Sequence, residues 1–497
     1  MTSTRGQAVV GTATVVGTEA IPVEVQVDVA NGLPAFAIVG LGDAAVLEAR
    51  ERVRAAMRAS GFAFPNARIV VNLAPGPLRK HGTGFDLPIA IAILRATGQL
   101  NGRLPDDCRA VGELALDGSV RSVSGMLAHA LGARRDGYGL IGPAASACVA
   151  TAVPDLTFRP VDSLRSLVDG SPARPSSRTP TAARTWPDLA DVCGQETARR
   201  ALEIAAVGGH NLLFTGPPGA GKTMLARRLG PLMPPLTAEE RLDTAVVHSV
   251  AGLDEGPVLA GERPFRAPHH SASIAGLVGG GSPLRPGEIS LAHHGVLFLD
   301  ELPEFGPASL QTLRQPMEDG EVTLVRAEGR IRFPARFTLV AAANPCPCGH
   351  TGDPSKPCRC SEASVSRYQA RVGGPLVDRI DLLLVLQRVD PALLVTFPTG
   401  ESSATVRERI CAARDRAIAS GAYPISVLSS SALLRACGMN VTARESLSSL
   451  SRALHLSGRG VTRLMRVART IAFLDGCDRV GREHLHEATL FRGEELR

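Results

Sequence analysis

The sequence predicts an α/β protein in which a parallel sheet covered by helices is followed by a helical lid and preceded by an α+β domain. Three observations indicate this. Strand-like and helix-like segments alternate over 188–395, which is typical of a parallel sheet with helical crossovers. From Val406 onward, apolar residues recur at three- and four-residue spacing instead. The stretch 170–187 is rich in proline, serine, threonine and arginine, which indicates a linker.

These changes of pattern divide the 497 residues into four parts. The parts are an amino-terminal α+β domain, a linker, a sheet domain and a carboxy-terminal helical domain, at 1–169, 170–187, 188–395 and 396–497. In the first domain, the Val- and Ile-rich stretch 68–73 predicts a strand, and 86–97 predicts a helix. In the last domain, Thr442 and Glu445 have the form of a capping box, so we expect a helix to begin there.

Composition narrows the class of protein. Hydrophobic residues make up 44% of the chain and charged residues 21%, so the chain can bury large cores. The net charge of +6 permits a polyanionic partner, whereas 4% aromatic residues disfavour recognition of stacked bases. No apolar stretch approaches the ~18 residues that cross a bilayer, and the chain does not open like a signal peptide. We therefore expect a cytoplasmic protein with no membrane partner.

The string GPPGAGKT has the pattern of a phosphate-binding loop. It follows the strand-like HNLLFT and precedes the helix-like MLARRLG, which is the order this motif requires. Its glycines, Gly216, Gly219 and Gly221, let backbone amides face phosphate oxygens. Lys222 can then reach the outer phosphates, and Thr223 can ligate Mg²⁺. The sequence therefore predicts a site for ATP and Mg²⁺.

A second motif, GVLFLDEL, supplies the acidic groups that such a site needs. Its apolar run is typical of a strand buried on both faces, and two acids follow where the strand emerges. We expect Asp300 to hold the Mg²⁺ shell and Glu301 to act as general base toward the attacking water.

With these two motifs the chain resembles the AAA+ ATPases, and more narrowly the YifB/ComM family of magnesium-chelatase-like ATPases. The narrower resemblance rests on the strings DVCGQETARRALEIAAVGGHNLLFTGPPGAGKTMLA, RPFRAPHHSAS, GLVGGG, GVLFLDELPEF, NPCPCG and LVDRIDL. It covers nearly the whole chain. The resemblance implies a homo-oligomeric ring, a hexamer, with ATP bound between neighbouring subunits.

The resemblance also implies roles for two residues beyond these motifs. Asn344, at the end of the strand-like FTLVAAAN, matches the sensor-1 position, which orients the hydrolytic water. Arg379 in LVDRIDL matches the arginine finger that a subunit supplies to its neighbour's ATP. The alternative for Arg379 is an ion pair within the chain, with Asp378 or Asp381.

The resemblance further implies a sensor-2 arginine in the helical lid. In SGRGVTRLMRVART, Arg459 matches that position best, and Arg463, one helical turn later, is the close alternative. Either could instead be ordinary surface charge.

Between the two nucleotide motifs lies an insert with three consecutive glycines and two histidine pairs. The resemblance places it in the second helix of the core, projecting toward a central pore. The pairs are His269 with His270 and His293 with His294. Adjacent histidines do not easily ligate one ion, and no carboxylate accompanies them at helical spacing. We expect a structural role or contact with a DNA backbone rather than a metal site.

A second insert, GEVTLVRAEGRIRFPARFTLV, predicts a hairpin immediately before sensor 1. Its arginines are candidates for DNA binding, and they are Arg326, Arg330, Arg332 and Arg336. Repeated around a ring, they would line a pore with guanidinium groups that grip phosphates without reading sequence. The alternative is a solvated, arginine-rich hairpin.

A cysteine cluster follows sensor 1 as C-x-C, nine residues, and C-x-C. Four thiolates, from Cys346, Cys348, Cys358 and Cys360, can close a tetrahedral Zn²⁺ site. Such a site would be structural, because four protein ligands leave no position for water. His350 could replace one sulfur, and reduced structural thiols are the alternative.

The amino-terminal domain resembles the Lon-protease-like, or S5-like, fold. In KHGTGFDLP, Gly84 stands where that family has its serine nucleophile, and GMLAHAL lacks the activating lysine. A dyad of Thr83 and His129 is the substitute we considered. We expect an inactive domain that serves binding or assembly, and no protease activity.

These features predict an ATP-hydrolysing ring motor that acts on single-stranded or branched DNA without sequence preference. The resemblance implies a helicase or branch-migration factor in recombination or natural transformation. One alternative is a magnesium-chelatase motor subunit that remodels a partner. Another is an ATP-switched scaffold, which would not need both Glu301 and Arg379.

Overall fold

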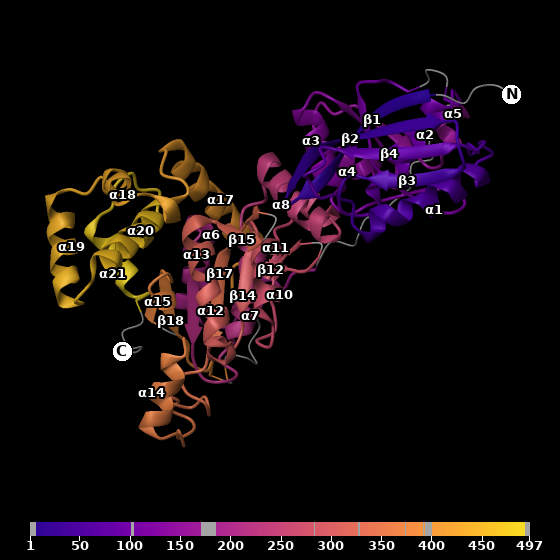
Figure 1. The fold of residues 1–497 in the computed structure, drawn as a ribbon. Helices are drawn as coiled ribbons and strands as arrows, with labels where there is room; N and C mark the ends of the chain where they lie inside the picture. The colour runs from indigo at the N-terminus through magenta and orange to yellow at the C-terminus, as the bar shows by residue number, and fades with distance from the viewer. Residues whose placement is uncertain are drawn as a thin grey trace.

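The computed structural model describes residues 6–100, 104–169, 185–282, 284–326, 329–372, 374–390, 392 and 400–492. Figure 1 shows the indigo amino-terminal domain at one end, the core sheet in the middle and the yellow helical domain at the other end. The chain is thus α/β with a parallel sheet and helices, and the predicted fold class is confirmed. Most of the linker predicted at 170–187 lies outside the described residues.

The amino-terminal domain is built on a mixed sheet with the strand order β3-β4-β2-β1-β5-β8-β9. In chain order these strands are β1 (Gly6–Val16), β2 (Glu19–Ala30), β3 (Ala35–Val39), β4 (Arg68–Ala74), β5 (Cys108–Ala110), β8 (Gly139–Pro143) and β9 (Phe158–Val161). The short strands β6 (Glu113–Leu114) and β7 (Val120–Arg121) pair with each other. The helices are α1 (Ala44–Ala59), α2 (Asp86–Ala96), α3 (Met126–Arg135), α4 (Ala147–Ala150) and α5 (Ser166–Asp169). Helix α2 is apolar all round because it is buried between the sheet and α1.

The core sheet has the order β11-β14-β17-β10-β18, and every pair in it is parallel. Its strands are β10 (Leu212–Thr215), β11 (Phe265–Arg266), β14 (Val296–Leu299), β17 (Thr338–Ala343) and β18 (Leu382–Val385). Helices of this domain are α6 (Glu196–Gly208), α7 (Lys222–Leu232), α8 (Ala238–Ala251), α12 (Pro307–Thr312), α13 (Arg314–Asp319), α14 (Glu362–Ala370) and α15 (Gly374–Val377). Strands β10, β14 and β17 are buried along their whole length, which explains their unbroken apolar runs. All five strands end at the same edge, so their following loops gather there.

The two inserts lie against each other. The first holds α9 (Gly256–Leu259), α10 (Ile274–Val278), β12 (Gly279–Gly280), β13 (Arg285–Pro286) and α11 (Glu288–Leu291). The second is the predicted hairpin, formed by the antiparallel strands β15 (Glu321–Arg326) and β16 (Gly329–Pro334). A Cβ added at Gly279 would lie 3.4 Å from a methyl group of Leu324, so the glycine-rich turn packs directly on the hairpin.

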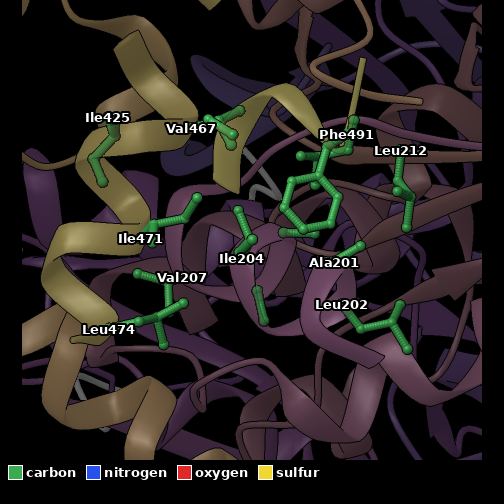
Figure 2. Close-up of a cluster of buried hydrophobic side chains, with 14 of the residues drawn as sticks. Ala201, Leu202, Ile204, Val207, Leu212, Ile425, Val467, Ile471, Leu474 and Phe491 are labelled. Atoms are coloured by element: carbon green, nitrogen blue, oxygen red, sulfur yellow. The ribbon is translucent and has the colours of Figure 1, made fainter. Parts of the chain in front are cut away.

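The carboxy-terminal domain is helical, as expected. It contains α17 (Ser403–Ala419), α18 (Ser430–Cys437), α19 (Val441–Ala453), α20 (Gly458–Leu474) and α21 (Arg482–Thr489). Figure 2 shows the apolar cluster that joins it to the core, with Ile204 of α6 facing Ile471 of α20. The predicted capping box at Thr442 is wrong: α19 begins at Val441, and Asn440 caps it by accepting from the amide of Ala443.

The amino-terminal domain is docked on the core through α3 and α8. The amide of Gly125 donates to the carbonyl of Ser249 at 2.8 Å, and the amide of Leu127 donates to the Ser249 hydroxyl at 3.2 Å. One apolar cluster contains buried side chains from both helices. At the turn between β1 and β2, a Cβ added to Gly17 would lie 3.0 Å from the carbonyl oxygen of Arg332 on β16. The domain therefore borders the arginine hairpin.

Candidate functional site

The phosphate loop connects the end of β10 to the start of α7. Gly219 and Gly221 have φ values of +83° and +88°, which a residue with a side chain adopts only with strain. Lys222 opens α7, and its ammonium donates to the Gly216 carbonyl at 2.6 Å and to the Asn344 amide oxygen at 2.9 Å. Burial lowers the pKa of Lys222. A half-buried ammonium bonded to neutral oxygens is well placed to bind a phosphate.

Acidic and hydroxyl groups meet beside this loop because the strands are parallel and in register. Leu299 of β14 pairs with Ala341 of β17, so the residues that follow leave the sheet together. The Thr223 hydroxyl donates to a carboxylate oxygen of Asp300 at 2.7 Å. Two oxygen donors in contact fit Mg²⁺, which binds carboxylate and hydroxyl oxygens. Glu301 follows with φ of +52°, a conformation that turns the chain sharply after the strand.

These groups line one hollow of about 420 Å³ at the carboxyl edge of the sheet. Its lining includes residues 218–224 of the loop and helix, together with Asp300, Glu301 and Asn344. The structure therefore brings together the residues that we predicted from three separate segments. Such a hollow, with a helix start at its floor and acids at its rim, suits a nucleoside triphosphate and its metal.

Sequence reasoning missed Gln195, which lies next to this loop. Its side-chain amide donates to the carbonyl of Gln387 at 2.8 Å and to that of Ala220 at 3.4 Å, so it ties β18 to the phosphate loop. Gln195 has φ of +56° and lines a second hollow of about 250 Å³ with the end of β18. An isolated glutamine before a helix carries no signal in the sequence that distinguishes it from a surface residue.

Arg379 lies at the other edge of the sheet, between α15 and the start of β18. It forms an ion pair with Glu318 of α13 and donates to the carbonyl of Pro375 at 2.6 Å. The partners considered from the sequence, Asp378 and Asp381, are not its partners. Asp378 faces Arg463 at 3.6 Å, and Asp381 contacts His210 at 3.1 Å.

Arg463 is tied to this same edge. Its guanidinium donates to the carbonyl of Ile380 at 2.9 Å and to that of Val377 at 3.1 Å, and burial lowers its pKa. Farther along α20, the hydroxyl of Thr470 and the ring of His210 are 2.7 Å apart. Helix α20 therefore follows the edge at which the strands begin. Arg459, exposed on its first turn, is not among the residues that line the hollow.

The four cysteines converge as predicted. The Sγ atom of Cys346 lies 3.4 Å from that of Cys348 and 3.7 Å from that of Cys358, and all four sulfurs lie within 4.8 Å of one another. Zinc bonds of ~2.3 Å to four tetrahedral sulfurs require sulfurs about 3.8 Å apart, so the cluster fits the ion. His350 is not part of this group: the four sulfurs converge without it, and its Nδ1 contacts Asp353 at 3.1 Å.

The pKa values of two of these thiols shift in opposite directions. Backbone amides of Arg359 and His350 lower the pKa of Cys348 to about 6. The pKa of Cys360 is raised to about 12: a backbone contact with Cys348 lowers it, but desolvation and the neighbouring sulfurs outweigh that contact. Four thiols this close do not all ionise without a cation, and a dication would stabilise the ionised set.

We expect the purified protein to carry about one zinc per chain, bound by these four thiolates. Elemental analysis of a preparation made without chelator measures it. Cys346→Ser and Cys358→Ser should lose the metal, whereas Cys148→Ser, at an exposed free cysteine, should keep it. Absence of zinc from the unaltered protein would contradict the assignment.

A carboxylate lies beside the second histidine pair, His293 and His294, although none accompanies the pair at helical spacing in the sequence. Asp243 of α8 lies with His293 and His294 within 4.8 Å. However, Nδ1 of His293 accepts the amide of Arg336 at 3.0 Å, so a neutral ring carries its proton on the other nitrogen. Burial lowers the pKa of His293 to about 2. No lone pair of this ring is left for a metal, and we assign the pair a structural role.

The four candidate DNA-binding arginines do not share one surface. Arg330 pairs with Val325 and Arg332 with Thr323, so both arginines lie on the same face of the hairpin. Arg326 lies on the opposite face, which also carries the buried Phe333. Its guanidinium reaches the other insert, 3.7 Å from a Cβ built at Gly280.

Arg336 lies outside the hairpin, in the connection to β17. Its amide and carbonyl are bonded to the ring of His293 and to the amide of His294. The predicted group of four is therefore divided among two faces and a connection. Arg285 of β13, exposed beside Gly280, is a basic residue that the sequence did not single out.

The amino-terminal domain has no dyad of Thr83 and His129. The Thr83 hydroxyl donates to the carboxylate of Glu113, and His129 is buried on α3. Burial and the nearby Arg109 lower the pKa of His129 to about 4. A Cβ at Gly84 would lie 3.2 Å from a methyl group of Val111, so even a small side chain there would be tight.

These features define an AAA+ ATPase. The parallel sheet carries a phosphate loop, the acidic pair Asp300 and Glu301, and Asn344 at the end of β17, and a helical domain follows it. Family models agree with this class. The model described as "Magnesium chelatase, subunit ChlI" matches residues 188–394, "Subunit ChlI of Mg-chelatase" matches 25–146, and "Magnesium chelatase, subunit ChlI C-terminal" matches 400–492.

The chain belongs to the YifB/ComM family of magnesium-chelatase-like AAA+ ATPases. It is 42% identical to "Uncharacterized protein YifB" of Escherichia coli over 98% of this chain and 97% of that protein. It is also 42% identical to "Competence protein ComM" of Haemophilus influenzae over 96% of this chain and 95% of that protein. The "Magnesium-chelatase 38 kDa subunit" of Rhodobacter capsulatus is 26% identical over 64% of this chain and 90% of that subunit. Among the described residues, no helix is both long and apolar enough to cross a membrane.

Proposed function

We propose that this protein is an ATP-driven, ring-forming DNA motor, a helicase or branch-migration factor. The observation that carries the proposal is the hairpin β15–β16, whose Arg330 and Arg332 face solvent beside a second basic insert. The similarity to a protein named for competence supports DNA as the substrate. Recombination or natural transformation is the process we expect it to serve.

The hydrolytic roles follow from the hollow. ATP binding would draw Lys222 from the Asn344 oxygen to the outer phosphates, because a phosphate offers it a charged acceptor. Thr223 and Asp300 would hold Mg²⁺, which neutralises charge on the β- and γ-phosphates. Glu301 would take a proton from the attacking water. The water oxygen bonds to the γ-phosphorus, and the bond from that phosphorus to the oxygen bridging the β- and γ-phosphates breaks, which releases ADP. Asn344, once released from Lys222, is free to orient that water.

The position of Arg379 favours a shared site. Arg379 precedes β18, whereas the phosphate loop follows β10, and these two strands are paired in register. Four strand residues at ~3.3 Å each separate the two edges by about 13 Å, so Arg379 cannot serve its own hollow. Arg459 lies one helical turn before Arg463, which is bonded to the same edge. We propose that Arg379 and Arg459 act on a neighbour's ATP, in a hexameric ring.

The arrangement of the hairpin favours binding to phosphates rather than bases. The side chain of Arg332 is 68% exposed, and its guanidinium lies 3.6 Å from the carboxylate of Glu321. The hairpin's aromatic residue, Phe333, is buried on the opposite face. Exposed arginines with no aromatic residue on their own face grip a backbone and read no sequence. Arg326 and Arg285, beside Gly280, would offer a second and separate phosphate contact at the first insert.

The double variant Arg330→Glu with Arg332→Glu should bind every DNA sequence more weakly, on the order of tenfold, because phosphate contacts are sequence-independent. The salt dependence should become flatter by a slope of about 2. ATPase activity without DNA should survive, since the hairpin lies outside the hollow. Binding and strand displacement or branch migration are measured at several salt concentrations.

The matched control is Arg435→Glu with Arg444→Glu, which makes the same change of charge on exposed positions of α18 and α19. It should bind DNA like the unaltered protein. If the hairpin variant remodels branched DNA as well as the parent does, the DNA mechanism is wrong. The magnesium-chelatase-type reading, in which the motor remodels a protein partner, is then preferred.

A further inference from the structure

His270, in the first insert, contacts the carboxylate of Glu301. Its Nδ1 atom lies 3.5 Å from Oε2 of Glu301. Strand β11 pairs with β14, with Phe265 opposite Val296 and Arg266 opposite Leu297. The segment that follows β11 leaves the sheet at the same edge as the end of β14, and it carries His270 to Glu301.

Neighbouring rings hold His270 in this position. The ring of His269 lies 4.1 Å from that of His270, centroid to centroid, and is itself fixed by a 2.8 Å contact between its Nδ1 and the Ser271 hydroxyl. The ring of Phe305 also lies edge-on to that of His270, at 6.4 Å. A ring held by two ring neighbours loses little further freedom when it contacts a carboxylate.

Glu301 needs such a partner. Its side chain is 53% exposed, and in the described part of the chain no other side chain forms an ion pair with it. Glu301 lines the nucleotide hollow, whereas His270 does not, so the imidazole approaches the carboxylate from outside the hollow. One oxygen is thereby engaged, and the other remains available to the hollow.

We propose that His270 is a positioning residue for Glu301. It fixes one carboxylate oxygen from outside the hollow so that the second oxygen faces the attacking water. A general base is effective only within hydrogen-bond reach of its proton, so a carboxylate that rotates freely is aligned for part of the time. This inference rests on the proposed role of Glu301 as general base and does not depend on DNA as the substrate.

ATPase kinetics of the full-length protein, measured without DNA, test the proposal. His270→Ala should lower kcat about tenfold, equivalent to about 1.4 kcal/mol, and leave KM for ATP unchanged. His270→Asn keeps an N–H donor at the position of Nδ1 and should restore most of the turnover. Unchanged or increased kcat in His270→Ala, or a loss that His270→Asn does not restore, would overturn the proposal.

A second background separates positioning from a general structural effect. In Glu301→Gln, the further change His270→Ala should lower the remaining turnover by less than twofold, because the group through which His270 acts is gone. An equal loss in both backgrounds would mean that His270 supports the insert and not Glu301. If Glu301→Gln alone retains full turnover, the assignment of Glu301 as general base is wrong, and this inference is overturned with it.

Discussion

Glu301→Gln should lower ATP turnover by about 10² or more while ATP binding survives, as expected when a water-activating group is removed. The amide has nearly the shape of the carboxylate but cannot accept the proton of the attacking water. Glu301 lies at the rim of the hollow, so its replacement leaves the loop and Lys222 in place. Steady-state ATPase rates and equilibrium binding of a fluorescent ATP analogue measure the two effects separately.

Lys222→Ala is the contrasting variant. It removes the ammonium that is bonded within the phosphate loop and should abolish productive binding of the nucleotide. The two variants therefore fail at different steps, one at binding and one at hydrolysis. A Glu301→Gln protein that still hydrolyses ATP at the parental rate would show that another group activates the water.

Arg379→Ala should lower ATP turnover by about 10³, the lower end of the range for a finger that stabilises charge in phosphoryl transfer. Because Arg379 lies at the edge opposite its own phosphate loop, our proposal assigns the lost group to the neighbour's site. Mixing Arg379→Ala subunits with Lys222→Ala subunits should therefore restore part of the activity. In mixed rings, some interfaces combine an intact phosphate loop with an intact finger.

Arg371→Ala is the matched control, because Arg371 lies eight residues before Arg379 in the chain and forms a looser ion pair, 3.7 Å long, with Glu304. It should keep near-normal turnover. If no mixture of Arg379→Ala and Lys222→Ala exceeds the activity of its two parents, Arg379 does not act across subunits. The ion pair with Glu318 would then be its whole role.

Much of the nucleotide site could be predicted because its groups are close together in the sequence. Gly216 to Thr223 form one loop, and Asp300 and Glu301 follow one apolar strand, so local pattern was enough. The cysteine cluster could be predicted for the same reason. The predicted domain order and helical lid also follow from periodicity, although the start of α19 does not, since Asn440 is as good a cap as Thr442.

The faces of the hairpin were harder to predict. Side chains in a strand alternate with a period of two, so the surface that an arginine occupies depends on the pairing register and on which face is buried. The sequence indicated four arginines in one segment. Only the pairing of Val325 with Arg330 and the burial of Phe333 separate Arg330 and Arg332 from Arg326.

The sequence by itself therefore determined the class of protein, the phosphate loop, the acidic pair and the four sulfurs, because each depends on residues within a short span. Only the tertiary structure decided the partner of Arg379, the edge to which α20 is bound, and the contact of His270 with Glu301. These depend on the order β11-β14-β17-β10-β18, in which neighbours in the sheet are far apart in the chain. Crossover connections of variable length set that order, and no local pattern records which strands they bring together.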